Sequence, residues 1–277
     1  MIPRGTQHAA LLPEPASVVE QIRLARSRAS LRFRLTFVAA WVVLVGGFVY
    51  LLVSGGKFDV GFVSTWWRFI LGGAGITILV AIVSIVLAVV FAVLGALGRL
   101  SKHATVYAVA TLYVSIVRGT PLIVQVIFVY LALPQIIPEA AKVPAIELGI
   151  FALAFNYGAY MTEIFRAGIQ AVPGGQREAA EALGMREGQV MRRVVLPQAI
   201  RIVIPAIGNE FISMLKDSAL VSLITVQELL WRANTVGSEN FKTLETLSIA
   251  AAVYWLLTII FSLFQDRLER RLAAGDR

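Results

Sequence analysis

Four charged residues lie within or at the ends of long apolar segments, where they could bind the charged groups of a small polar molecule. They are Arg118, Glu163, Lys216 and Asp217. A charge inside a membrane-spanning helix is costly, so it usually faces the bundle interior, a partner or a water-filled path. A zwitterionic substrate needs one cationic partner and one anionic or amide partner. The four charges, together with the amides of Gln125 and Asn156, supply both kinds.

Each of these charges also has a structural interpretation, and the sequence leaves both interpretations open. Glu163 precedes Arg166 by three positions, so the two side chains can pair on one helix. Lys216 and Asp217 are adjacent and therefore face different directions, so each could instead join its helix to a neighbouring one.

Arg118 begins the run Arg118-Gly119-Thr120-Pro121, which interrupts an apolar segment. A broken helix is tolerated at membrane depth only where protein or water covers it, and in transporters such breaks often line the substrate site. Alternatively, the break is a structural kink in which Arg118 bonds to the freed carbonyls.

Residues suited to catalysis or cofactor binding are not arranged in any familiar pattern. The chain has no cysteine and only two histidines, and it contains no phosphate-binding Gly-x-x-x-x-Gly-Lys loop, no Gly-x-Ser-x-Gly, no His-Glu-x-x-His and no paired carboxylates. We therefore expect no catalytic residue, no metal and no cofactor in this chain.

The elements that must position these residues are membrane helices. The chain of 277 residues is 58% hydrophobic and 15% charged, with a mean hydropathy of +0.77, whereas globular chains carry about 25% charged residues. We expect an all-α polytopic membrane protein with about six spans of roughly 20 residues each. The predicted spans, the third interrupted at Gly119–Pro121 and the fifth kinked or broken near Pro205, are Leu35–Val53, Phe69–Leu97, Thr105–Leu133, Glu147–Ile169, Ile200–Ile224 and Thr246–Phe264.

The distribution of basic residues predicts the orientation of these spans. With both termini in the cytosol, 18 of the 25 Lys and Arg residues fall in cytosolic segments, against five outside. This asymmetry follows the positive-inside rule, so the net charge of +8 needs no nucleic acid as a partner. Residues 1–34 contain no apolar core of a signal peptide; we interpret them as a partly disordered cytosolic tail before an uncleaved first span.

The longest predicted cytosolic loop, Pro173–Ile200, forms a helical elbow. We expect a helix over Gln176–Leu183, a left-handed stop at Gly184 and a second helix over Arg186–Val195, with Pro197 opening the next element. The apolar side of this elbow suits a docking partner or the lipid interface. Its net charge of only +1, from four Arg and three Glu, is too small for electrostatic lipid binding.

This loop resembles the EAA loop of the permease subunits of bacterial ABC importers, which docks on a cytosolic ATPase. The resemblance rests on Glu178-Ala179-Ala180, Gly184 and Leu196-Pro197. Other segments look like the polar amino acid subfamily, and the similarity extends from about Gly73 to Leu268. These segments are Arg118–Gln125, Asn156–Tyr160, Glu163–Arg166, Lys216–Ser218 and Thr225–Leu229.

The resemblance implies a translocation subunit with a permease domain at 61–268. The chain departs from the family at its front, where a basic tail (1–34) and an extra span and loop (35–60) precede this domain, and we expect a cytosolic tail at 269–277. The resemblance implies ATPase-coupling residues at Glu178, Ala179, Ala180, Glu181, Leu183, Gly184, Met185, Arg186, Leu196 and Pro197. The candidate substrate pathway comprises Arg118, Gly119, Thr120, Pro121, Gln125, Asn156, Tyr160, Glu163, Lys216, Asp217 and Ser218.

The resemblance also implies the partners of the chain. These are two ATPase copies carrying ATP and Mg, a second permease copy or homologue, an extracytoplasmic solute-binding protein and a polar amino acid, all at a bacterial inner membrane. Two other functions remain open from the sequence. A secondary carrier would run on an ion gradient without an ATPase, although we find no internal repeat of the kind that many carriers show. A membrane scaffold would use the same elbow to dock a partner and transport nothing.

Overall fold

The computed structural model describes residues 15–55 and 58–273, and the secondary structure in those ranges is helical. Residues 1–60 and 61–277 form two compact units. The all-α prediction is therefore confirmed for the described residues. Residues 1–14 and 274–277, which belong to the two expected tails, lie outside the described ranges.

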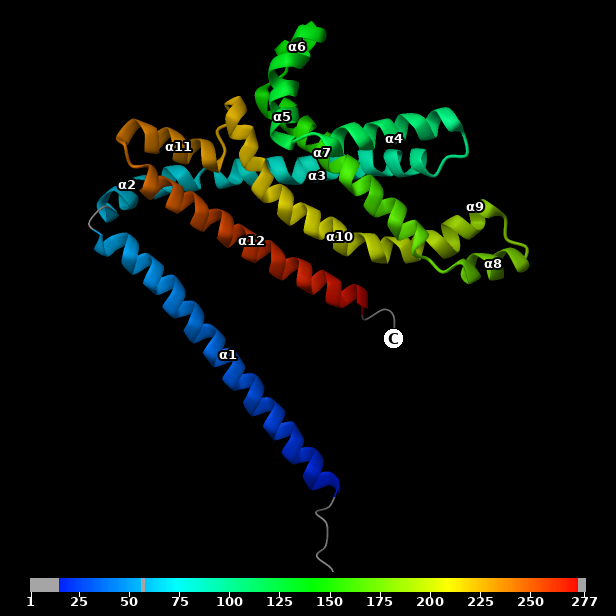
Figure 1. Cartoon of the computed structure of the whole chain (residues 1–277), viewed down its shortest axis with the longest axis horizontal. Coiled ribbons are helices and arrows are strands. Elements are labelled where there is room, and N and C mark those ends of the chain that lie inside the picture. The colour runs from blue at the N-terminus through cyan, green and yellow to red at the C-terminus, as the bar shows by residue number, and fades with distance from the viewer. Residues whose placement is uncertain (1–14, 56–57, 274–277) are drawn as a thin grey trace, which may run out of the picture. The chain divides into compact units, whose positions relative to one another are not determined.

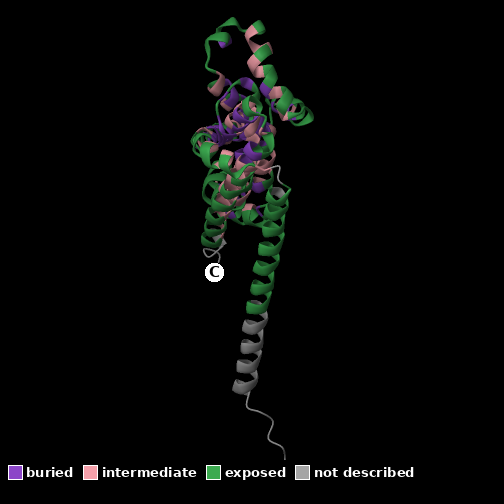
Figure 2. Cartoon of the chain, turned by 90° about the vertical axis from the view of Figure 1, so that its left-hand side faces the viewer, coloured by how far each residue is buried: buried purple, intermediate pink, exposed green. Residues whose placement is uncertain are grey.

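Helix α1 of the first unit runs from Pro15 to Ser54 as one helix of 40 residues. It crosses the expected boundary at residue 34 without a break, so residues 15–34 of the expected tail are helical. All side chains from Leu31 to Tyr50 are exposed (Figure 2). An apolar helix without a buried face needs lipid or another protein around it.

The second unit is a bundle of helices (Figure 1). Its α-helices are α2 (Val60–Leu71), α3 (Ala74–Arg99), α4 (Ala104–Gly119), α5 (Leu122–Ile127), α6 (Leu133–Ile136), α7 (Ala145–Gln170), α8 (Gly174–Ala182), α9 (Glu187–Val190), α10 (Leu196–Asp217), α11 (Leu229–Asn240) and α12 (Thr243–Ala273). Two π-helical turns, Phe128–Ala132 and Met191–Val195, and two 3-10 turns, Pro138–Lys142 and Ser218–Ile224, connect some of them.

Small side chains bring α3, α7 and α10 close together at the centre of the bundle. Ala81, Ala88 and Ala92 of α3 are buried in one cluster with Tyr157 and Met161 of α7 and with Met214 of α10. Gly95 of α3 packs directly against Thr162. Helices in membranes associate through such close packing because lipid offers no hydrophobic driving force between them.

The third predicted span is broken where the sequence indicated. Helices α4 and α5 meet at Thr120–Pro121 with a bend of 107°. Pro121 has no N–H to continue the ladder of α4. The chain therefore turns away, and α5 rises beside the bundle (Figure 1).

The fifth predicted span differs from expectation at both ends. Helix α9, the π-helical turn Met191–Val195 and α10 follow one another directly, so the helical run begins well before the predicted start at Ile200. Pro197 lies in the first turn of α10 and opens that helix, as predicted. A π-helical turn just before Pro197 accommodates the missing N–H of this proline. Pro205 lies inside α10 without interrupting it, and the last seven residues of the predicted span form the 3-10 turn Ser218–Ile224.

Helix α11 lies at the end of the bundle opposite to α8 and α9 (Figure 1). The buried carboxylate of Glu228 holds it there. Glu228 accepts hydrogen bonds from the Thr77 hydroxyl (3.1 Å), the Tyr254 hydroxyl (2.6 Å) and the backbone N–H of Trp231 (2.8 Å). One side chain thus caps α11 and joins it to α3 and α12.

By length and hydropathy, fewer helices qualify as membrane spans than the six predicted from the sequence. Within the described residues, three helical stretches, Leu31–Leu51, Val60–Arg99 and Thr243–Arg271, are long and apolar enough to cross a membrane, or four spans if the bent pair α4–α5 is one of them. Helices α7 and α10, with 26 and 22 residues, have the required length but not the composition. Both carry polar side chains into the interior of the bundle, which lowers their mean hydropathy.

The Gly72-Gly73 break between α2 and α3 generates a testable prediction. A Cβ at Gly73 would lie 2.7 Å from the backbone nitrogen of Leu229, whereas nothing lies within 4 Å of a Cβ at Gly75. We expect Gly73→Ala to destabilise the protein by about 1–3 kcal/mol, because α11 must move away. Thermal unfolding in detergent measures this, with Gly75→Ala as the matched control. Equal melting temperatures for the two variants would contradict the close approach.

Candidate functional site

A polar cavity of about 230 Å³ opens at the break between α4 and α5. It is smaller than the roughly 300–1,000 Å³ of sites for drug-sized ligands, so it suits a small molecule. Three parts of the fold line it: the break itself, the middle of α7 and the second half of α10. The lining residues are Thr120, Pro121, Leu122, Asn156, Tyr157, Tyr160, Glu210 and Asp217.

The helical periods of α7 and α10 explain how these side chains meet. Asn156, Tyr157 and Tyr160 span just over one turn of α7 and therefore share a face. Glu210 and Asp217 are seven residues apart on α10, which is two turns, so they lie one above the other. The cavity thus brings together two carboxylates that the sequence analysis did not recognise as a pair.

Gln125 organises the break beside the cavity. Its amide nitrogen donates to the carbonyl of Val117 (2.8 Å), the carbonyl of Thr120 (3.2 Å) and the hydroxyl of Thr120 (2.7 Å). Its oxygen accepts a hydrogen bond from the amide of Asn156 (3.0 Å). Gln125, rather than Arg118, therefore bonds to the carbonyls at the end of α4 and ties the break to α7.

The two carboxylates of the cavity have different surroundings. Asp217 accepts a hydrogen bond of 2.7 Å from the Tyr157 hydroxyl, which fixes it against α7. Within the described part of the chain, no hydrogen bond or ion pair engages the side chain of Glu210, which is only half-buried. Its carboxylate is therefore available to whatever enters the cavity.

The other predicted pathway residues lie outside this cavity. Glu163 binds Arg166 through two hydrogen bonds, of 2.6 and 2.8 Å, and pairs with Arg99 of α3 at 3.3 Å. This arrangement corresponds to the structural interpretation of Glu163. It joins α7 to α3 at the end of the bundle that carries α8 and α9.

Arg118, Lys216 and Ser218 likewise do not line the cavity. The Arg118 guanidinium lies 5.2 Å from the centre of the Tyr160 ring, a cation–π distance. Lys216 is exposed, whereas Ser218 is buried and donates to the carbonyl of Leu215 at 2.9 Å. Of the predicted pathway residues, the structure brings together Thr120, Pro121, Asn156, Tyr160 and Asp217 in the cavity wall, with Gln125 behind them.

Sequence reasoning missed Leu122, Tyr157 and Glu210. Glu210 carries a signal that could have revealed it, because it precedes Asp217 by two helical turns and shares its face. Tyr157 stands next to Asn156 in a segment that the resemblance already included.

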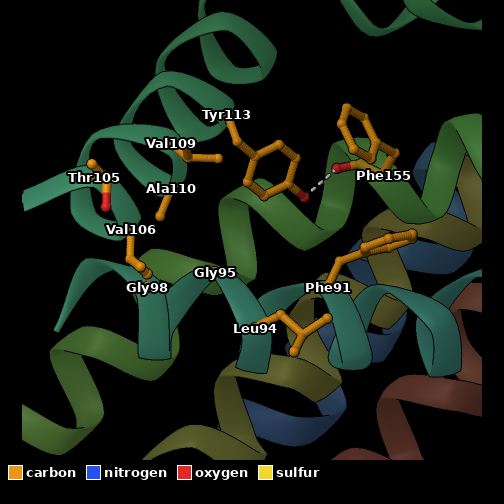
Figure 3. Close-up of a pocket in the computed structure, with 10 residues that line it drawn as sticks. All are labelled: Phe91, Leu94, Gly95, Gly98, Thr105, Val106, Val109, Ala110, Tyr113 and Phe155. Carbon is orange, nitrogen blue, oxygen red and sulfur yellow. Dashed lines mark hydrogen bonds between the residues drawn. The ribbon is translucent and has the colours of Figure 1, made fainter. Parts of the chain in front are cut away.

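A second hollow, of about 540 Å³, has a different character. It lies between α3, α4 and α7, and Figure 3 shows Tyr113 of α4 reaching across to donate a 2.7 Å hydrogen bond to the carbonyl of Phe155. The remaining lining is almost entirely aliphatic, aromatic or glycine. None of the ten described residues that line it is charged, so we do not assign a polar substrate to it.

The predicted elbow is present at the C-terminal end of α7. Helix α8 ends at Ala182, and Gly184 has a φ of +80°, which confirms the left-handed stop. Ala180 packs inside a small core with Val172, Val190 and Val195. Glu178, Ala179, Glu181 and Arg186 are exposed, and Leu183 is 84% exposed.

Hydrogen bonds fix this elbow to the two helices that leave it. Arg177 donates to the carbonyl of Ile169 in α7 at 2.7 Å, and Gln198 of α10 donates to Gln176 of α8 at 2.5 Å. The partly buried Met185 packs against the elbow core, so the predicted apolar side is divided. Ala180 and Met185 face inward, and Ala179 and Leu183 face outward.

Known proteins resemble this chain over most of its length. Residues 88–274 match the family described as binding-protein-dependent transport system inner membrane component. "Probable amino-acid permease protein YxeN" of Bacillus subtilis is 40% identical over 202 residues, which are 73% of this chain and 90% of that protein. "Arginine transport system permease protein ArtQ" of Bacillus subtilis is 36% identical over 208 residues, 75% of this chain and 94% of that protein.

A solved structure shares the fold. The crystal structure of an amino acid ABC transporter with histidines superposes with a TM-score of 0.72 at 38% identity, over 77% of this chain and 98% of that one. The family match covers more than half of the chain, and the relatives are covered almost completely. The chain is a multi-pass inner-membrane protein and belongs to the family of binding-protein-dependent transport system inner membrane components, the permease subunits of ABC transporters.

Proposed function

We propose that this permease subunit carries amino acids through the cavity between α5, α7 and α10, driven by an ATPase that docks on the α8–α9 elbow. One observation supports this above all. The elbow connects directly to α7 on one side and to the continuous α9–α10 helix on the other, and these two helices supply five of the eight cavity-lining residues. A movement of the elbow therefore moves the walls of the cavity.

The polar lining supports a polar substrate. A free amino acid has an ammonium group, a carboxylate and few other heavy atoms, which matches a cavity of about 230 Å³ with carboxylate, amide and phenol groups. Relatives named for amino acid and arginine transport, and a related structure of an amino acid ABC transporter, support the same class.

The elbow is built as a lever. Its own apolar core and its hydrogen bonds to Ile169 and Gln198 make it a rigid unit. The exposed residues Glu178, Ala179, Glu181, Leu183 and Arg186 form the surface that meets the ATPase, with Leu183 as an apolar anchor. Leu196 and Pro197 belong to the helix that transmits the movement.

The remaining partners follow from this assignment. Two ATPase copies bind ATP and Mg, so the chemistry of hydrolysis takes place outside this chain. A second permease copy or a homologue supplies the other half of the pathway, and an extracytoplasmic binding protein delivers the amino acid. Family membership favours this ATP-driven mechanism over an ion-driven secondary carrier.

The orientation follows from the elbow and the basic residues. The α3–α4 turn lies beside α9, because Lys102 pairs with Glu187 at 3.4 Å. The α3–α4 turn and α9 therefore both lie on the cytosolic side. This agrees with the excess of Lys and Arg in the segments predicted to be cytosolic. Helix α11 lies at the opposite end of the bundle (Figure 1). In this orientation α11 is on the outer side of the membrane and both chain termini are cytosolic.

The elbow generates a prediction about coupling. We expect Gly184→Val to reduce amino acid uptake at least about tenfold while the protein still inserts, because a β-branched residue is strained at a φ of +80°. Uptake and ATP hydrolysis are measured in proteoliposomes with the ATPase and binding protein. Gly188→Val is the control, since Gly188 has no positive φ and no atom within 4 Å of its Cβ position. Full uptake by Gly184→Val would refute the lever.

The orientation generates a second prediction, and the absence of native cysteines makes it direct. In His103→Cys and Ser238→Cys, both at exposed positions, a membrane-impermeant thiol reagent added to intact cells should label only Cys at position 238. The position-103 thiol should react after permeabilisation. The reverse pattern would overturn the proposed orientation.

A further inference from the structure

The charge of the polar cavity restricts the substrates that it accepts. Among the eight described residues that line it, two are carboxylates, Glu210 and Asp217, and none is cationic. The nearby Arg118 is engaged with the Tyr160 ring and does not line the cavity. A carboxylate in a membrane-spanning helix is costly unless a cation or hydrogen bonds compensate it. Asp217 has one such bond from Tyr157, and Glu210 has none within the described part of the chain.

The hydrogen-bonding groups of the cavity also restrict which substrates it accepts. The Tyr157 hydroxyl donates to Asp217, and the Thr120 hydroxyl donates to the carbonyl of Ile116. These two donors are therefore already engaged. The oxygens of Glu210 and the second oxygen of Asp217 remain as acceptors. The Tyr160 hydroxyl and the second N–H of Asn156 remain as donors. The acceptors without a partner still outnumber these donors, so a ligand that fits donates more hydrogen bonds than it accepts.

We propose that the cavity selects amino acids with a cationic side chain, such as arginine or lysine, and that Glu210 is the residue that determines this selectivity. This rests on the proposed function of the same cavity. Every amino acid has one α-carboxylate, to which the Asn156 amide and the Tyr160 hydroxyl of the lining can donate in place of a cation. It also has one α-ammonium group, which one carboxylate suffices to bind. The second, unpaired carboxylate is complementary to a further cation on the side chain. A guanidinium offers five donors and an ammonium three, which matches the surplus of acceptors.

The separation of the two carboxylates suits this assignment. Seven residues of helix correspond to about 10 Å of rise along the axis, a distance that an extended amino acid side chain can span. Asp217, held by Tyr157, lies beside the Asn156–Gln125 pair at the break. Glu210 lies two turns nearer the start of α10, so α-ammonium and side-chain cation can be bound at different levels.

Arginine and citrulline provide the sharpest pair of probes, because citrulline has nearly the shape of arginine with a neutral ureido group. Binding of each is measured by titration calorimetry on the purified full-length permease with its ATPase. We expect the wild-type protein to bind L-arginine at least about tenfold more tightly than L-citrulline. Glu210→Gln should abolish this preference by weakening arginine alone, because the charge-assisted hydrogen bonds are lost.

The control is Glu239→Gln, which removes an exposed carboxylate of α11 and should leave both affinities unchanged. Should Glu210→Gln fail to fold, the wild-type ratio of arginine to citrulline still decides the question. Equal affinities for the two ligands, or tighter binding of glutamine or glutamate, would overturn the cationic selectivity and leave the proposed amino acid transport intact. Failure of all four amino acids to bind would overturn both.

Discussion

Backbone groups exposed by a broken helix must be bonded by the protein itself inside a bilayer, and the candidate site of this chain depends on that constraint. At Gly119–Pro121 the chain turns by 107°, and the amide of Gln125 bonds to the carbonyls of Val117 and Thr120. The same amide is joined to Asn156, which lines the cavity. The bonds that make the break possible are therefore the bonds that position one wall of the candidate site.

The other walls come from helices that are too polar to be recognised as spans by hydropathy. Helices α7 and α10 carry Asn156, Glu210 and Asp217 toward the cavity, and small residues of α3 let both helices approach closely. The same two helices flank the α8–α9 elbow in the chain: α7 precedes it, and α10 follows α9 through a π-helical turn. This continuous run connects the elbow directly to the two carboxylates of the cavity.

The N-terminal region differs from the rest of the chain. The family match begins at residue 88 and the permease bundle starts after residue 60. Helix α1, exposed along its apolar length, forms a unit of its own. Its surface is of the kind that lipid or another membrane protein covers, whereas the bundle keeps its polar groups inside.

The sequence alone determined the helical class, the break at Gly119–Pro121, the left-handed stop at Gly184 and the resemblance to permeases, because each depends on local chemistry. Composition, proline and glycine act within a few residues and leave a direct trace in the sequence. Only the tertiary structure decided that Gln125 rather than Arg118 bonds to the break, that Glu163 pairs with Arg166 and Arg99, and that Glu210 and Asp217 share a cavity. These outcomes depend on which helix faces lie against one another, and one sequence does not specify that.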